Sequence, residues 1–407
     1  MSPPSPGLGD VIDRFEAPLR LQRGAAMTSA QSAVLSALSR CRTAALGGHL
    51  YRCERCGHEH PAYNGCRDRH CPSCLGGKSA AWLTARSSEL LPLPYFHVVF
   101  TVPQQVAAVA LGNKKVVYSI LFRAAARTLQ QIAADPRHLG AQLGFLAILH
   151  TWTQTLQHHP HIHCVVPGGG LAPDGSRWVR SREDFLLPVK VLSKLFAGKF
   201  LDLLTKAYER GELRFGGSTA SLAQAHGFKQ WVRRVRDKSW VVYSKPPFGS
   251  PQQVLKYLAR YTHRVAISNA RIVSVTDTEV AFRYRSRKAG NAMGTMRLAG
   301  EEFLRRFLLH VLPKGFVRIR HFGWMANRDR KAKLARCRAL LGVTAAAASQ
   351  ETEAPNRRDI EQDPATSQPQ PEPKRCPNCK LGLLRLVRSL PALMNTSLGS
   401  RVPRAPP

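Results

Sequence analysis

Four of the ten cysteines in this 407-residue chain form two Cys-x2-Cys pairs near the N-terminus. Cys53 and Cys56 make the first pair, and Cys71 and Cys74 make the second, with fourteen residues between them. Each pair places two thiolates on one tight turn, and two such turns facing each other give the tetrahedral sulfur geometry that suits Zn²⁺. A redox dithiol is the alternative for a single pair, but two pairs at this spacing favour metal. The sequence therefore predicts a structural zinc site on these four residues.

The same segment holds further residues of the kind that bind zinc: Cys41, His49, Cys66 and His70. They would form a second zinc site, and buried free cysteines with turn histidines are the alternative. We therefore expect one or two structural Zn²⁺ ions. A third pair, Cys376 and Cys379, has no cysteine or histidine after it, so the sequence predicts an incomplete knuckle there.

The charge balance indicates a polyanionic partner. Sixty Lys and Arg against 26 Asp and Glu give a formal net charge of +34. Such an excess destabilises a compact protein by self-repulsion, and phosphates that neutralise it release condensed counterions. A membrane surface is the competing partner, but the basic residues are spread along the chain instead of lying on one amphipathic helix. No signal peptide and no unbroken apolar stretch of membrane-spanning length is seen, so we expect a cytoplasmic, bacterial protein that associates with the nucleoid when bound to DNA.

The stretch "HHPHIHCVVP" at residues 158–167 crowds histidines at the start of an expected strand. Residues i and i+2 of a strand point to the same face, so His161 and His163 would project side by side. Two imidazoles at this spacing suit one divalent cation, although most such pairs are surface residues. A third ligand must come from elsewhere. Gln154, on the preceding strand, is our choice by spacing, and Gln157 and His159 are the alternatives.

The elements around this stretch are read from apolar patterns. Residues 93–103 and 144–152 are expected as strands because they are rich in β-branched and aromatic residues. Residues 104–135 show helical apolar spacing and end at a proline. Residues 161–169 would then pair with 144–152 as an antiparallel hairpin.

A second motif, "YLARYTH", follows about a hundred residues later on an expected helix that begins at Ser250-Pro251. Tyr257 and Tyr261 are four residues apart and would share one helix face. They are either a packing stripe or nucleophiles, because a phenol can attack a phosphodiester whose charge a metal and nearby cations neutralise. The flanking basic residues are the expected DNA contacts: Lys256, Arg260 and Arg264.

Together "CRDRHCPSC", "HPHIHCVVPGGG" and "YLARYTHRVAISN" resemble the transposases of the insertion-sequence ninety-one (IS91) family, which belong to the HUH nucleases. The resemblance runs from about residue 40 to about residue 342. It implies an α+β fold in which an HUH-type nuclease domain, a central antiparallel sheet flanked by helices, follows a small zinc-binding domain. It also implies His161 and His163 as ligands of a catalytic Mg²⁺ or Mn²⁺, and Tyr257 and Tyr261 as paired nucleophiles.

These observations lead us to expect a DNA transposase that nicks and rejoins single-stranded DNA at mobile-element ends and targets, through 5′-phosphotyrosine intermediates, by a rolling-circle-like mechanism. An HUH replication initiator or relaxase, and a non-catalytic zinc-containing DNA-binding protein, are the alternatives. Because composition turns polar and low in complexity after residue 342, we expect a disordered linker there. The expected segments are an N-terminal arm (1–27), the zinc-binding domain (28–90), the HUH two-tyrosine domain (91–342), the linker (343–375) and a C-terminal tail (376–407).

Overall fold

The computed structural model describes residues 6–74, 82, 86–248, 253–254, 266–286, 290, 292–343 and 375–393. The fold is mixed α+β, as expected, and its sheets are antiparallel. The chain divides into two compact units that are both discontinuous in sequence. Unit 1 takes Met1–Lys78, Ile267–Arg305 and Thr352–Pro407, and unit 2 takes Ser79–Ala266 and Arg306–Glu351.

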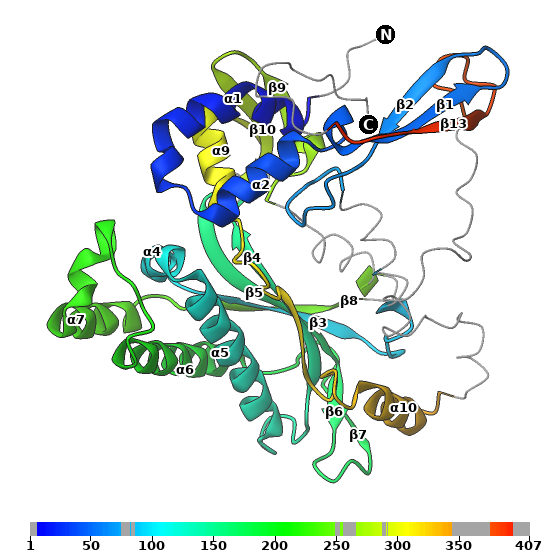
Figure 1. Ribbon diagram of the computed structural model, residues 1–407. Helices are drawn as coiled ribbons and strands as arrows, with labels where there is room; N and C mark the ends of the chain where they lie inside the picture. The colour runs from blue at the N-terminus through cyan, green and yellow to red at the C-terminus, as the bar shows by residue number, and fades with distance from the viewer. Residues whose placement is uncertain are drawn as a thin grey trace. The chain divides into compact units, whose positions relative to one another are not determined.

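Unit 2 is built on a five-stranded antiparallel sheet with the strand order β12-β4-β5-β3-β8 (Figure 1). The strands are β3 (Tyr95–Thr101), β4 (Gly144–Trp152), β5 (His158–Pro167), β8 (Val242–Phe248) and β12 (Ile319–Gly323). The expected hairpin is confirmed, because β4 and β5 pair antiparallel across a short turn. The strand that carries the histidine motif is therefore the central one.

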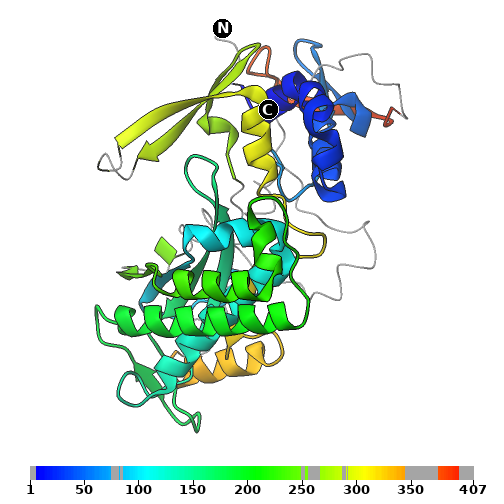
Figure 2. The same cartoon turned by 90° about the vertical axis from the view of Figure 1, so that its left-hand side faces the viewer.

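Alternate residues of a strand point to opposite faces of the sheet, and the buried apolar residues of β5 at positions 162, 164 and 166 share one face. Ile162, Cys164 and Val166 are fully buried and belong to the main core. Helices α4 (Gln104–Gly112), α5 (Lys114–Ala134), α6 (Val189–Glu209) and α7 (Ala225–Arg236) contribute the rest of that core. Figures 1 and 2 show these helices gathered on one side of the sheet.

The described residues cover the other face of the sheet only in part. A smaller apolar cluster there joins Leu146, Ile148 and Val165 to Leu334 and Cys337 of α10 (Arg330–Leu340). The short pair β6 (Gly169–Leu171) and β7 (Trp178–Arg180) continues from the end of β5. The side chains of His161 and His163 lie on this second face.

The expected continuous helix over residues 104–135 is interrupted at one residue. Asn113 is buried, and its side-chain amide donates to the carbonyls of Val109 (3.0 Å) and Arg214 (2.8 Å). Its Oδ1 accepts from the backbone N–H of Arg214 at 2.7 Å. These bonds hold the chain between α4 and α5 to the segment after α6, and they replace the helical bonds lost at the break.

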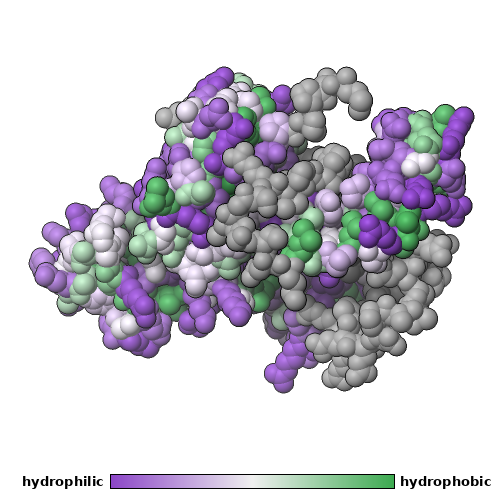
Figure 3. Space-filling model, turned by 45° about the horizontal axis from the view of Figure 1, so that its top comes forward, coloured by the Kyte–Doolittle hydropathy of each residue, from purple (hydrophilic) through white to green (hydrophobic). Residues whose placement is uncertain are grey.

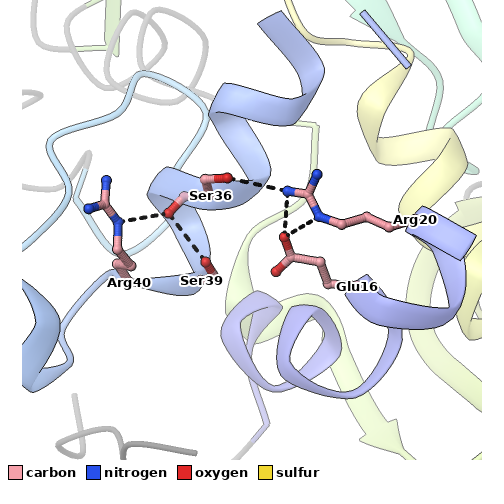
Figure 4. A network of polar contacts seen from close by, with 5 residues as sticks. All are labelled: Glu16, Arg20, Ser36, Ser39 and Arg40. Atoms are coloured by element: carbon pink, nitrogen blue, oxygen red, sulfur yellow. Dashed lines mark hydrogen bonds and ion pairs between the residues drawn. The ribbon is translucent and has the colours of Figure 1, made fainter. Parts of the chain in front are cut away.

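Unit 1 begins with a helical pair, α1 (Leu8–Arg23) and α2 (Ser29–Ser39). Figure 4 shows how their facing surfaces are joined. Arg20 of α1 donates to Glu16 one turn earlier and to the Ser36 hydroxyl of α2. Val11, Ile12 and Phe15 of α1 are buried, so residues 8–23, inside the segment that we expected as an N-terminal arm, form a packed helix.

Two three-stranded sheets complete unit 1. One has the order β11-β10-β9, from β9 (Ile272–Val275), β10 (Glu279–Ser286) and β11 (Ala292–Ala299), and it leads into α9 (Gly300–Leu308). The second has the order β13-β1-β2, from β1 (Gly48–Cys53), β2 (Glu59–Tyr63) and β13 (Leu384–Leu390). Short 3-10 turns at Gly24–Ala26, Ala44–Leu46, Gly217–Ala223 and Asn269–Arg271 lie within the two units.

The two compact units differ from the expected succession of domains. The C-terminal tail is not a separate segment, because β13 pairs with β1 over the whole of that strand. Residues 267–305, expected inside the nuclease domain, join the zinc-binding unit. Most of the expected linker, residues 344–374, lies outside the described residues. Hydrophilic side chains cover much of the described surface in Figure 3, in keeping with the high content of Lys and Arg.

Candidate active site and metal centres

Three histidines meet on the partly covered face of the unit 2 sheet. His161 and His163 are two residues apart on β5, and His150 of β4 lies directly opposite His161 in the antiparallel register. One ring nitrogen of each of the three lies within 4.8 Å of the others. His150 and His163 are buried, at 3% and 8% exposed, and His161 is half-buried. The i, i+2 prediction from the sequence is thus confirmed in its geometry.

Hydrogen bonds orient two of these rings. The Nδ1 of His161 lies 2.7 Å from the carbonyl oxygen of His159. A carbonyl only accepts, so this nitrogen carries the proton, and in the neutral ring Nε2 is the nitrogen with a lone pair. The Nδ1 of His163 lies 2.8 Å from Nε2 of His97 on β3. Burial, with the nearby charges of Lys245 and His161, lowers the pKa of His97 to about 3, so His97 is neutral and its hydrogen bond helps to orient the His163 ring.

His158 and His310 are close in space but do not join the three. His158 points to the opposite face of β5, where its Nε2 lies 2.7 Å from the hydroxyl of Tyr118 on α5. The His310 ring bridges Thr151 at the end of β4 and the carbonyl of Leu156 in the β4–β5 turn, both at 3.1 Å. These two histidines support the strands that carry the site.

The expected third ligand, Gln154, is corrected by the register. The turn between β4 and β5 occupies residues 153–157, so Gln154 lies beyond the paired part of the hairpin. His150 occupies the position opposite His161 instead. Gln157 is exposed in the same turn, and His159 is half-buried beside His161. Pairing Gln154 with His161 would require the chain to turn about two residues later than it does.

The tyrosine motif lies outside the described residues, and so do its expected DNA contacts: Tyr257, Tyr261, Lys256, Arg260 and Arg264. Just before them, Gln253 and Val254 are helical. Val254 is fully buried in the cluster that contains Ile148 and Val165. Ile148 pairs with His163 and Val165 is two residues from it, so Val254 packs on the face that carries the histidines.

The cysteines of unit 1 form two groups of four, where one or two zinc sites were expected. Cys41, Cys66, Cys71 and Cys74 make the first group, with Sγ–Sγ distances of 3.5–3.8 Å. A tetrahedron of sulfurs about 2.3 Å from zinc has edges of about 3.8 Å. The donor set and its spacing fit Zn²⁺.

The expected zinc sites are corrected accordingly. Cys53 and Cys56 group with Cys376 and Cys379, and not with the second pair at 71 and 74. The third knuckle is therefore complete. His49 and His70 are outside both groups: His49 lies on β1 next to Tyr51, and His70 bonds Asp68 through Nδ1 at 2.9 Å. The hairpin of β1 and β2 separates the two early cysteine pairs, which spacing alone did not reveal.

Comparison with known proteins gives the chain a family. A model described as "Transposase zinc-binding domain" matches residues 11–102, and one described as "Putative transposase" matches residues 144–333. The "Putative transposase y4qJ" of Sinorhizobium fredii (strain NBRC 101917 / NGR234) is 49% identical over 382 residues, which cover 94% of this chain and 95% of that protein. The chain belongs to the IS91 family of transposases.

A second relative of the transposase is the "Transposase for insertion sequence element IS801" of Pseudomonas savastanoi pv. phaseolicola. It is 28% identical over 304 residues, 71% of this chain and 68% of that protein. Among solved structures, the conjugative relaxase TrwC in complex with oriT DNA aligns with 61% of this chain and 73% of its own, at 19% identity and a TM-score of 0.24. That score is too low to support a shared fold. In the described parts of the transposase, no helix has the length and apolar content needed to cross a bilayer.

Several site residues of the transposase were missed in the sequence. His150 sits in "ILHTW" and His97 in "YFHVV", each a lone histidine in an apolar strand. Tyr243 of β8 pairs with Val99, and Lys245 pairs with His97, so both also lie on the face of the histidines. A polar residue within a strand that is otherwise apolar was the available signal, but choosing its partners required the strand order.

Proposed function

We propose that this transposase nicks and rejoins single-stranded DNA through 5′-phosphotyrosine intermediates, and so moves an insertion sequence by a rolling-circle-like mechanism. The observation that carries the proposal is the group of His150, His161 and His163 on one face of the five-stranded antiparallel sheet. DNA at mobile-element ends and at the target is the proposed partner, in keeping with the +34 charge. We place the protein at the bacterial nucleoid when it is bound to DNA.

The three imidazoles are proposed to hold a divalent cation. Neutral imidazole nitrogens favour transition-metal ions over Mg²⁺, which prefers oxygen ligands, so Mn²⁺ fits this donor set better. A cation bound there would offset the negative charge of the scissile phosphate and leave the remaining coordination positions to phosphate oxygens and water. His97 and the His159 carbonyl fix the ring orientations in advance, so little reorganisation is needed when the metal and DNA bind.

Tyr257 and Tyr261 are the proposed nucleophiles. The sequence predicts a helix from Ser250-Pro251, and on a helix positions three and seven residues after Val254 share its face. Those positions are Tyr257 and Tyr261, and Val254 packs on the face of the histidines. The burial of Val254 therefore supports the phenols facing the metal ligands.

In the proposed reaction, the phenolic oxygen of one tyrosine forms a bond to phosphorus and the bond from phosphorus to the 3′-oxygen breaks. The phenol loses its proton, and the departing 3′-oxygen gains one. The second tyrosine does the same at another strand, and a free 3′-hydroxyl then attacks either phosphotyrosine to release the phenol. Lys256, Arg260 and Arg264 are proposed to neutralise the phosphates along the bound strand.

A covalent-adduct assay tests this proposal. Single-stranded oligonucleotides that tile the DNA on both sides of the gene are incubated with the protein and Mn²⁺ or Mg²⁺. A 5′-phosphotyrosine retains the downstream fragment, so we expect 3′-labelled DNA to label the protein and 5′-labelled DNA to appear as a shorter free product. We expect more adduct with Mn²⁺ than with Mg²⁺. Tyr257→Phe with Tyr261→Phe should abolish the adduct, whereas Tyr208→Phe on α6, whose hydroxyl bonds Ala223, should not change it.

Tyr243 is the strongest alternative nucleophile, because it lies on the face of the sheet that carries the histidines and is 48% exposed. The substitution Tyr243→Phe tests this alternative. If this substitution alone removes the adduct, the nucleophile is Tyr243 and the assignment to Tyr257 and Tyr261 is wrong. If no variant forms an adduct and the wild type does not either, the protein is a non-catalytic DNA-binding protein.

Loss of a metal ligand is the second test. His163→Asn should reduce adduct formation by about a hundredfold or more at saturating Mn²⁺, because the site loses one of three ligands. Binding of the same oligonucleotide in a filter assay should change by less than about threefold, since phosphate contacts dominate affinity. His138→Asn is the matched control because His138 is exposed and in a turn. An unchanged adduct yield in His163→Asn would show that the histidines are structural.

A further inference from the structure

We propose that Cys53, Cys56, Cys376 and Cys379 bind a second structural zinc, which closes the two ends of the transposase into one zinc ribbon. The Sγ atoms of Cys53 and Cys379 are 3.7 Å apart, and those of Cys56 and Cys376 are also 3.7 Å apart. All four sulfurs lie within 4.8 Å of one another. These separations match the edges, about 3.8 Å, of a tetrahedral Zn–S4 site. The proposal is independent of the chemistry assigned to the histidines, and neither matched family model extends to Cys376.

The two knuckles repeat one backbone geometry although they are about 320 residues apart. In each, the carbonyl of the first cysteine accepts a bond of 3.0 Å from the N–H four residues later: Gly57 to Cys53, and Lys380 to Cys376. Both of these donor residues have a left-handed backbone, with φ of +68° and +62°. A left-handed lysine is unfavourable unless the surrounding structure requires it. The repeat therefore indicates that both turns are shaped for one shared ligand.

Backbone N–H groups also point at the sulfurs. The N–H groups of Arg55 and Cys56 donate to Sγ of Cys53 at 3.4 and 3.5 Å, and the N–H of Gly382 donates to Sγ of Cys379 at 3.3 Å. Such bonds stabilise thiolates, which are the form that binds metal. The space near Cys53 is correspondingly tight, because a Cβ at Gly382 would lie 2.5 Å from its Sγ.

The apolar contacts around β13 are too few to hold this strand by themselves. The buried cluster at this place consists of Cys53, Cys376 and Leu384, with Tyr51 and Cys379 packed against it. Along β13, Leu386 is 58% exposed and Val387 is 44% exposed. Strands with so small a core depend on metal, disulfides or other cross-links. A metal shared by the two knuckles supplies the missing stabilisation where β13 begins.

Two disulfides are the chemical alternative, and the distances argue against them. A disulfide requires sulfurs about 2.05 Å apart, whereas both opposed pairs are at 3.7 Å. A disulfide would also consume the thiolates that the backbone N–H groups stabilise. The consequence of zinc is that residues 375–393 are an integral part of the zinc-binding unit, and a copy that lacks Cys376 and Cys379 would lose the third strand of the ribbon.

Zinc content tests the proposal on the full-length chain. We measure it by atomic emission after gel filtration, in a His163→Asn background so that the histidine site adds little metal. We expect two zinc ions per chain in the His163→Asn protein. When Cys376→Ser and Cys379→Ser are added to this protein, we expect one zinc ion per chain. Cys337→Ala, a buried cysteine of α10 outside both groups, should retain two. Equal zinc content with and without Cys376 and Cys379 would overturn the proposal.

A measurement on the wild-type chain covers the case in which the double variant fails to fold. Cysteines are alkylated with and without a zinc chelator, and the modified peptides are quantified by mass spectrometry. We expect Cys376 and Cys379 to be protected together with Cys53 and Cys56, and all four to become reactive as one step when zinc is removed. Alkylation of Cys376 and Cys379 in the zinc-loaded protein, or recovery of the four as disulfide-linked peptides, would refute the shared site.

Discussion

The roles of individual histidines in this transposase follow from strand parity and register. His161 and His163 could be paired from sequence, because an i, i+2 spacing on a strand puts two side chains on one face. His158 is an odd number of residues from both, so its side chain points to the opposite face of the sheet. There it contacts Tyr118 of helix α5. His150 and His97 could not be assigned in advance, since their positions depend on how β4 and β3 align with β5. Local spacing predicted two members of the histidine group, and the strand register supplied the third, His150, together with the neighbouring His97.

His158 should make the stability of unit 2 sensitive to acid. Burial, with a contribution from the charge of Lys114, lowers the pKa of His158 from 6.5 to about 3. Above pH 6.5 the ring is neutral in both folded and unfolded chains and has no pH-dependent effect. Between pH 6.5 and about 3, His158 binds a proton in the unfolded chain but not in the folded chain. The free energy of unfolding therefore falls by about 1.4 kcal/mol for each unit by which the pH is lowered in this range.

The comparison with His158→Gln isolates this effect, because glutamine does not titrate and its amide oxygen can accept from the Tyr118 hydroxyl. Urea unfolding gives the free energy of unfolding of both chains at pH 7.5 and at pH 5. We expect the decrease in this free energy from pH 7.5 to pH 5 to be about 2 kcal/mol larger in the wild type than in the variant. Other acid-sensitive groups, including the cysteine clusters, are common to both chains and cancel. Equal losses in the two chains would show that His158 is protonated in the folded state.

At the level of elements, local patterns predicted which segments are strands and helices but not how they pair. The three strands expected near the histidine motif are present, with ends that differ by a few residues. The helix break at Asn113 was missed because its cause is a bond to Arg214, a hundred residues away. The pairing of cysteine knuckles was missed for the same reason, since β13 reaches β1 across almost the whole chain. Each missed feature depends on a long-range contact.

The same elements show that a tryptophan-rich segment anchors a helix. Trp231 and Trp240 lie in a stretch with five basic residues, which would also suit stacking on bases. Both rings are buried in the main core, at 8% and 6% exposed. The basic side chains of α7, such as Arg233 and Arg234, are exposed. Any contact of α7 with DNA is therefore electrostatic and not by stacking of these rings.

Strand β12 should be intolerant of a side chain at its last residue. Gly323 has φ of +62°, and a Cβ there would overlap the carbonyl oxygen of Leu143. Because that atom is backbone next to β4, the strand of His150, we expect Gly323→Ala to destabilise unit 2 by about 3 kcal/mol or more. Gly315 has φ of +73° but open space around it, so Gly315→Ala should cost only about 1 kcal/mol.

Denaturant unfolding of both alanine variants measures this difference, with wild-type protein as reference. The left-handed backbone is common to the two sites, so the difference between them reports the clash alone. Equal destabilisation would mean that β12 shifts freely against β4. A drop in adduct yield for Gly323→Ala, beyond what unfolding explains, would further show that β12 helps to position His150.

For the whole molecule, the sequence predicted the class and the family but not the boundaries. The motifs occur in the expected order, and the comparisons confirm the family. Both compact units are discontinuous, so composition along the chain does not mark where one ends. Residues 267–305 and β13 belong to the same compact unit as the N-terminal helices. Discontinuous units are a property of contacts, which a linear reading does not contain.

The net charge predicts how the intact transposase should bind DNA as salt changes. With +34 on the chain, binding should be dominated by phosphate contacts that release counterions. Neutralising about six phosphates of single-stranded DNA gives a slope of about −4 for the logarithm of affinity against the logarithm of salt concentration. Affinity for a fluorescein-labelled oligonucleotide should therefore fall by a few hundredfold between about 50 and about 200 mM NaCl. Fluorescence anisotropy measures this directly.

His163→Asn should show the same slope, because a metal ligand adds no phosphate contact, and a peptide nucleic acid of the same bases should bind weakly at every salt concentration. A slope shallower than about −1 would mean that the basic residues serve another partner, since so few released counterions cannot account for tight binding of DNA.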